Sequence, residues 1–140
     1  MRLWHKALIP YLPRQQLLGQ WRECCLIAKN ISEKGTPNHI LVNRIMDYPL
    51  DHFWTYCGLI CIEMESRGYR SDFSKLEYYM NEDGYDLIDF NELFYPWHGK
   101  EYLKQCYYNL EEKFDCGAIK ENEFNNIKNY YEEVINDGRL

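Results

Sequence analysis

The feature that most constrains this chain is a helical spacing of apolar residues with no competing strand pattern. Between Arg14 and about residue 30, apolar side chains recur at the intervals of an α-helix: Leu17, Leu18, Trp21, Cys24, Cys25 and Ala28. This spacing gathers them on one face, with Trp21 in the core. No segment shows the apolar–polar alternation of a half-buried strand. The sequence therefore predicts an all-α fold.

Turn-forming residues divide the rest of the chain. Pro10 and Pro13 predict a non-helical lead-in, and residues 33–37 predict a turn. Further helices are expected at 38–46, from about Pro49 to Gly68 as the C-cap, at 100–114 and at 121–136, with an acidic loop near 81–84 between two short helices. There are no internal repeats, low-complexity tracts or linkers. Residues 1–140 are thus expected to form a single domain, a compact helical bundle.

Two segments bear on localisation. The basic start of the chain is not followed by the apolar run of a signal peptide before Pro10. The most apolar stretch, 57–62, is far shorter than a membrane helix. We therefore expect a cytoplasmic protein with no membrane partner, in which the six cysteines stay reduced.

Cysteine and histidine spacing offers no clear metal site. Cys57 and Cys61 are four residues apart and Cys24 and Cys25 are adjacent, but no Cys-x-x-Cys pair or Cys/His set is present. Reduced cysteine is a common core residue, so packing is the preferred interpretation. No metal and no cofactor are expected.

Charge is unevenly distributed along the chain. The net charge is −6, yet residues 1–46 carry seven basic and two acidic side chains, a net of +5. The remainder carries nine basic and twenty acidic side chains, a net of −11. Such asymmetry is typical of nucleic-acid contact, although an uneven solvated surface fits the charges as well.

An acid and a base lie side by side on the polar face of the first predicted helix. On a helical wheel Arg22 and Glu23 fall outside the apolar stripe, on an arc that includes Gly19, where another backbone has room to approach. From spacing alone, such a pair is more often solvated surface than a catalytic site.

The chain resembles the pyrimidine-dimer DNA glycosylase family in several ordered segments. The run from Leu17 to Glu23, with its aromatic-Arg-Glu triplet, is similar to the first helix of that family. Further similar segments are Met1-Arg2-Leu3-Trp4, Asn38-His39 with Leu41 and Arg44, Asp47-Tyr48-Pro49 with Tyr56, Glu63 with Arg67-Gly68-Tyr69, and, weakly, 109–113. The resemblance covers most of residues 1–69 and part of the final third.

The resemblance implies an all-α DNA glycosylase and abasic-site lyase whose nucleophile is the N-terminal α-amine. The amine would attack C1′ of the damaged nucleotide, expel the base and form a Schiff base, and β-elimination would then cut the strand. Protein α-amines as a class have a pKa near 8, against about 10.4 for lysine, so more of the neutral nucleophile is present. By resemblance Glu23 stabilises the imine and moves protons, and the expected DNA-binding residues are Arg2, Arg14, Arg22, His39 and Lys113. For His39 a structural role at the start of a helix fits the sequence as well as a DNA contact does.

The chain departs from the phage type of this family at several positions. It begins Met1-Arg2, and the initiator Met is normally retained before so bulky a residue, so Met1 is expected to supply the amine. Leu26 and Asn109 stand where the phage type has arginines. Each lost phosphate contact weakens DNA binding and flattens its salt dependence.

The sequence thus predicts a monomeric repair enzyme with Met1 and Glu23 as catalytic residues and damaged duplex DNA as its partner. The alternative is a non-catalytic helical interaction module that retains the fold, which the acidic remainder and the missing arginines favour. The role of the acidic segment 72–92 and the preferred lesion are left open.

Overall fold

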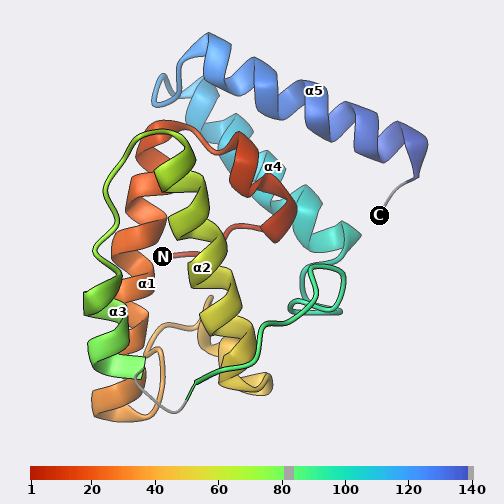
Figure 1. Ribbon diagram of the computed structural model, residues 1–140. Coiled ribbons are helices and arrows are strands. Elements are labelled where there is room, and N and C mark those ends of the chain that lie inside the picture. Colours follow the sequence, from red (N-terminus) through yellow and green to blue (C-terminus); the bar gives the residue numbers. More distant parts are fainter. Residues whose placement is uncertain (81–83, 139–140) are drawn as a thin grey trace.

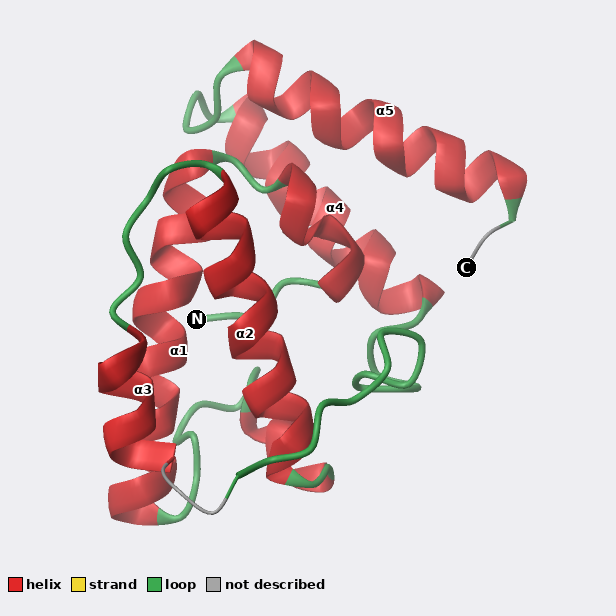
Figure 2. Cartoon of the chain, viewed as in Figure 1, coloured by secondary structure: helices red, strands yellow, loops and turns green. Residues whose placement is uncertain are grey.

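The computed structural model describes residues 1–80 and 84–138, and all regular structure within them is helical (Figure 2). The order along the chain is η1 (Lys6–Tyr11), α1 (Arg14–Lys34), η2 (Asn43–Asp47), α2 (Leu50–Ser66), α3 (Phe73–Met80), α4 (Lys100–Asp115) and α5 (Glu121–Asp137), where η denotes a 3₁₀-helix. The predicted all-α class is confirmed.

The helices form two groups that the N-terminal segment joins (Figure 1). In the first group α1 packs against both α2 and α3, and in the second α4 packs against α5. The 3₁₀-helix η1 contacts α2 on one side and α5 on the other. Residues from all of these elements share one apolar core, in which Tyr56, Phe53 and Phe94 are among the largest fully buried side chains.

Helix α1 has the apolar face that the periodicity predicts. Leu17, Cys24, Ile27 and Ala28 are fully buried, and Trp21 is 7% exposed, so its assignment to the core is confirmed. The helix continues to Lys34, past the predicted end near residue 30, because Gly35 adopts φ +75° and its N–H donates to the carbonyl of Ile31.

Three other element predictions need correction. The lead-in is not free of helix: η1 contains Pro10, which a short 3₁₀-helix tolerates because only one internal hydrogen bond is lost. The helix expected at 38–46 is reduced to η2, because Asn38 has φ +62° and cannot start a helix. Helix α2 ends at Ser66 with Arg67 as C-cap, and Gly68 supplies the left-handed conformation one residue later.

The segment between α2 and α4 matches its prediction in part. One short helix, α3, is present before residue 81, but residues 84–98 contain turns and no second helix. The predicted acidic loop at 81–84 falls mainly on residues 81–83, which lie outside the described residues. Helices α4 and α5 begin at the predicted residues and end one residue later than predicted.

None of the described helices combines the length and the apolar character that a membrane span requires.

Candidate active site

The first residues of the chain are anchored in the core by side chains from three helices. The backbone N–H of Trp4 donates to Gln20 Oε1 of α1 at 2.8 Å. The Tyr56 hydroxyl of α2 donates to the Trp4 carbonyl at 2.6 Å, and the Tyr102 hydroxyl of α4 donates to the Leu3 carbonyl at 2.5 Å. These bonds fix the direction in which the N-terminus points, because consecutive backbone groups are held from different sides.

Gln20 connects this segment to Glu23. Gln20 is 1% exposed, and its amide is fully engaged: Oε1 accepts from the Trp4 N–H and, at 3.0 Å, shares the Tyr56 hydroxyl proton with the Trp4 carbonyl. Its Nε2 donates to the Arg2 carbonyl at 3.0 Å and to Glu23 Oε2 at 3.3 Å. One buried amide therefore sets the position of the N-terminal backbone and of the carboxylate together.

The anchored segment ends in a cavity of about 220 Å³ that also contains Glu23. The lining residues are Met1, Arg2 and Trp4 from the segment, Glu23 from α1, Leu41 from the loop before η2, and Asn109 and Lys113 from α4. Glu23 is partly buried. The cavity thus brings together the N-terminal residue, the Glu23 carboxylate and two cationic side chains, Arg2 and Lys113. This set can attract an anion, attack an electrophilic carbon and transfer a proton.

Arg2 lies between the cavity and the core. It is partly buried, and its guanidinium is 5.8 Å from the centroid of the Trp4 ring. Burial raises the pKa of Tyr102 far above its ordinary value, and the neighbouring charge of Arg2 acts in the opposite direction. Tyr102 therefore stays a neutral hydrogen-bond donor to the N-terminal segment.

Arg22, Arg14 and His39 are not among the residues that line this cavity. Arg22 is exposed on the outer face of α1, with its guanidinium over Gly19; an added Cβ there would be 3.7 Å from Arg22 Nη2. The room at Gly19 is thus used by this side chain, and the backbone approach considered from the sequence is not observed.

Arg14 and His39 have structural partners elsewhere. The backbone N–H of Arg14 donates to Glu123 Oε2 at 2.9 Å, and its guanidinium is 5.5 Å from the Tyr69 ring centroid. His39 Nδ1 accepts from the Leu41 N–H at 3.2 Å, which shapes the loop that brings Leu41 to the cavity. Of the predicted site residues, the structure therefore groups Met1, Arg2, Glu23 and Lys113.

A pair of buried histidines lies directly after the anchored segment. The rings of His5 and His98 stack with centroids 5.1 Å apart. His5 Nδ1 accepts from the Ala7 N–H and His98 Nδ1 accepts from the Lys6 N–H, both at 3.0 Å. Burial lowers the pKa of His5 to about 4, and burial also lowers the pKa of His98 well below its ordinary value. Both rings are neutral at physiological pH and act as structural acceptors.

Lys6 ties the loop before α4 to the same region. Its ammonium donates to the carbonyls of Phe90 and Leu93, at 2.5 and 2.8 Å, and burial lowers its pKa. Although Lys6 belongs to the basic N-terminal third, its side chain is 5% exposed. It is therefore a structural cation and does not belong to a DNA-facing surface.

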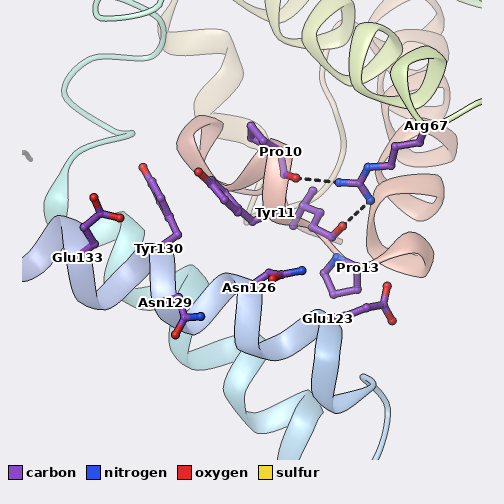
Figure 3. Close-up of a pocket in the computed structure, with 10 residues that line it drawn as sticks. Pro10, Tyr11, Pro13, Arg67, Glu123, Asn126, Asn129, Tyr130 and Glu133 are labelled. Carbon is purple, nitrogen blue, oxygen red and sulfur yellow. Dashed lines mark hydrogen bonds between the residues drawn. The ribbon is translucent and has the colours of Figure 1, made fainter.

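A larger cavity of about 510 Å³ lies at the other end of the N-terminal segment (Figure 3). Figure 3 shows Arg67 pointing at the lead-in, where it donates to the carbonyls of Leu12 at 2.7 Å and Pro10 at 3.1 Å. Arg67 also forms an ion pair with Glu63 at 2.7 Å. The remaining charged lining residues, Glu123 and Glu133, are acidic. This cavity is therefore poorly suited to a phosphate ligand.

The described residues include no group of three or more His, Cys, Asp or Glu side chains placed to bind a metal ion. Cys57 and Cys24 are fully buried and Cys61 is nearly so, whereas Cys25 is partly buried and Cys116 is exposed.

Three residues that form the site were not predicted from the sequence: Gln20, Tyr56 as a hydrogen-bond donor, and Tyr102. Gln20 had a recognisable signal, because it lies on the apolar stripe three residues after Leu17 and four before Cys24. A polar side chain at such a position must find internal partners. Tyr56 was singled out only as part of the family resemblance, and nothing distinguished Tyr102 among the thirteen tyrosines of the chain.

The geometry defines a class of protein: a helical domain whose anchored N-terminal segment ends in a cavity that a partly buried carboxylate also lines. A family model described as pyrimidine dimer DNA glycosylase matches residues 1–77, which include Met1, Gln20, Glu23 and Tyr56. The chain belongs to this family. Neither a curated protein nor a solved structure matches the chain. Tyr102, Asn109 and Lys113, which complete the cavity from α4, lie outside the matched residues.

Proposed function

We propose that the protein is a DNA glycosylase and abasic-site lyase that acts on pyrimidine dimers or related damage in duplex DNA. The observation that carries the proposal is that Met1 and Glu23 line one cavity together with Arg2 and Lys113. Membership of the pyrimidine dimer DNA glycosylase family supports DNA as the substrate. The enzyme would act as a monomer in the cytoplasm and need no cofactor.

In the first step the neutral α-amine of Met1 attacks C1′ of the damaged nucleotide. A nitrogen–carbon bond forms, and the glycosidic bond breaks with its electron pair leaving on the base. Loss of one amine proton, followed by opening of the sugar at O4′, which takes up a proton and becomes a hydroxyl, gives a cationic imine. The Glu23 carboxylate lies in the same cavity, so it supports stabilisation of this cation and proton transfer to the ring oxygen.

In the second step a proton leaves C2′ and the strand breaks. Glu23 accepts this proton, a C2′–C3′ double bond forms, and the C3′–O bond breaks with the phosphate as leaving group. Water then hydrolyses the imine and restores the amine. Arg2 and Lys113, at the rim of the cavity, would hold the phosphates that flank the reacting sugar.

The residues outside the cavity have a more distant role in this proposal. Arg22, exposed on the adjacent face of α1, would contact the DNA backbone beside the lesion. Arg14 begins α1 nine residues before Glu23, about 13 Å along the helix axis, so it would reach only flanking DNA. His39 would act through the loop it shapes.

Borohydride trapping on duplex DNA with an abasic site or a thymine dimer tests the proposal. Reduction of the imine should leave a stable adduct, and mass spectrometry should map it to the Met1 amine. A version with an N-terminal extension should fold normally and form no adduct. An adduct on a lysine would contradict the assigned nucleophile. No adduct on either DNA, from folded protein with a free N-terminus, would leave the non-catalytic interaction module as the better hypothesis.

A further inference from the structure

A further concave surface lies between α1 and α3, two helices that pack side by side (Figure 1). It is a groove of about 500 Å³ between the two helices. Its lining consists of Cys25, Leu26 and Lys29 from α1 and Ser74, Lys75, Tyr78 and Tyr79 from α3. We propose that this α1–α3 groove binds the sugar–phosphate backbone of DNA two to three nucleotides from the damaged site. The inference rests on the proposed function, because it takes damaged duplex DNA as the ligand.

The floor of the groove presents apolar surface to solvent. Leu26 is 45% exposed and Tyr78 is 79% exposed, with the Tyr78 ring edge-on to Tyr79 at 4.9 Å between centroids. Burial raises the pKa of the Cys25 thiol to about 11, so the floor carries no thiolate at neutral pH. A deoxyribose offers carbon-bound hydrogens that can pack on such a surface, and the Tyr78 ring provides a stacking face.

The rim of the groove presents positive charge from both helices. Lys29 stands on the α1 side and Lys75 on the α3 side. Within the described part of the chain, neither ammonium lies within ion-pair distance of a carboxylate. Asp72 is a nearby acid whose charge helps to raise the pKa of the Cys25 thiol. Its carboxylate is already engaged, because it accepts hydrogen bonds from the N–H and hydroxyl of Ser74 at the start of α3. Two unpaired cations over an apolar floor match a phosphodiester chain better than a neutral ligand.

The distance between the groove and Glu23 determines which nucleotides the groove would contact. Arg22, Leu26 and Lys29 are spaced four and three residues apart, so they form one exposed ridge along α1. The cavity with Glu23 borders this ridge on one side and Cys25 borders it on the other. Lys29 is six residues beyond Glu23, about 9 Å along the axis. In the proposed complex α1 lies along the duplex, so this distance corresponds to two to three nucleotides of one strand at about 3.4 Å each.

A charge-removal experiment tests the groove. The double variant Lys29→Ala/Lys75→Ala is compared with Lys120→Ala/Lys128→Ala. The control removes the same charge from two exposed positions of another helix, the N-cap of α5 and the middle of α5. Binding is measured on a duplex with a tetrahydrofuran abasic analogue, which cannot form the imine, over a range of salt concentrations. The groove variant should bind about tenfold more weakly at low salt, and the slope of log K against log salt should fall by about 1.8. The α5 control should match wild type.

Duplex length provides a second readout. When the duplex is cut back to one base pair beyond the abasic site on the contacted side, wild type and groove variant should bind equally. Tyr78→Ser should weaken binding to the long duplex about threefold and leave the salt slope unchanged, because it removes an uncharged contact.

The outcomes separate this inference from the proposed function. If wild type binds and is trapped but the groove variant behaves like the α5 control, the groove inference is overturned and the surface is left for a protein partner. If wild type binds with the predicted groove dependence but forms no imine, the groove stands and the lyase proposal falls. If wild type shows no salt-dependent binding to the duplex, both fall.

Discussion

Two cavities lie at the two ends of the same N-terminal segment. Met1, Arg2 and Trp4 line one of about 220 Å³, and residues 10–13 line the other, of about 510 Å³. The larger cavity contains one cation, Arg67, which is already bound to backbone carbonyls and to Glu63. The smaller contains an amine, Arg2 and Lys113 around the single carboxylate of Glu23.

This difference shows that volume alone does not identify the candidate site. In the larger cavity the contacts of Arg67 and Tyr11 serve the fold: Arg67 donates to the carbonyls of Leu12 and Pro10, and the Tyr11 and Tyr130 rings stack with centroids 4.3 Å apart. In the smaller cavity Met1, Arg2, Glu23 and Lys113 line one space, while Gln20 and Tyr102 hold the backbone of the N-terminal segment. A site must present chemistry to a ligand, and only the smaller cavity does so.

The largest expected effect comes from changing one carboxylate in each cavity. Glu23→Gln should slow imine trapping on an abasic duplex about 10²–10³-fold, because the amide cannot accept the C2′ proton or neutralise the imine. The matched variant Glu133→Gln, in the larger cavity, should trap at the wild-type rate. Single-turnover trapping at saturating DNA measures both. Equal rates for the two variants would remove the functional distinction between the cavities.

The second prediction concerns acid stability. The pKa of folded His5 is about 4 against about 6.5 when unfolded, so the unfolded chain binds more protons between these values. This contribution to stability is fully present above about pH 6.5 and is lost as the pH falls towards 4. His5 alone should account for about 3 kcal/mol across that window. Burial lowers the pKa of His98 in the same direction and adds to the loss.

Urea unfolding at pH 7 and pH 5 measures this loss. His98→Gln keeps an acceptor for the Lys6 N–H but removes the titrating ring, so its stability should depend less on pH than that of wild type. His39→Gln, in the exposed loop before η2, should retain the full pH dependence. If wild type had the same free energy of unfolding at pH 7 and pH 5, protonation of these histidines would not destabilise the fold, which would contradict the prediction.

The third prediction assigns the larger cavity to stability. Arg67→Met removes the ion pair with Glu63 and the donors to the carbonyls of Leu12 and Pro10. The free energy of unfolding should fall by about 2 kcal/mol, as expected for hydrogen bonds from a charged group. The trapping rate per folded molecule should stay unchanged. A large loss of trapping rate in folded Arg67→Met would mean that the two ends of the segment are coupled.

The helices were largely predictable because their apolar spacing is local. The starts of α1, α4 and α5 follow directly from residues at those positions. The errors lie at helix ends, where the backbone conformation of a single residue determines the boundary. Helix α1 continues until Gly35, which has φ +75°, and the helix expected at 38–46 does not form at Asn38, which has φ +62°. Proline in η1 was interpreted as a helix breaker, although a single 3₁₀ turn accommodates it.

The candidate site was only partly predictable, and the reason is tertiary packing. Met1, Arg2, Glu23 and Lys113 were proposed from resemblance, and α4 brings Lys113 to the cavity through packing that no local pattern encodes. Charge by segment was misleading for Lys6, whose ammonium is buried against the loop before α4. The roles of Arg14, Arg22 and His39 stay predictions, because these side chains do not line the cavity.

The smallest expected effect isolates positioning from chemistry in the small cavity. Gln20→Glu keeps acceptors for the Trp4 N–H and the Tyr56 hydroxyl but loses the donor that joins the Arg2 carbonyl to Glu23. The single-turnover trapping rate at saturating DNA should fall about tenfold, because a second carboxylate beside Glu23 also repels it from its position. The pH profile of trapping should move to higher pH for the same reason.

Tyr56→Phe is the matched control, because it removes the hydrogen bonds to the Trp4 carbonyl and to Gln20 Oε1 but leaves the Gln20 Nε2 donor to Glu23 in place. It should lower the free energy of unfolding by about 1 kcal/mol and leave the pH profile of trapping in place. A purely structural role for Gln20 would make the two variants alike, each losing stability with no shift in the profile. A shift confined to Gln20→Glu would establish that this amide positions Glu23 for the reaction, and that the small cavity depends on it as the large one depends on Arg67.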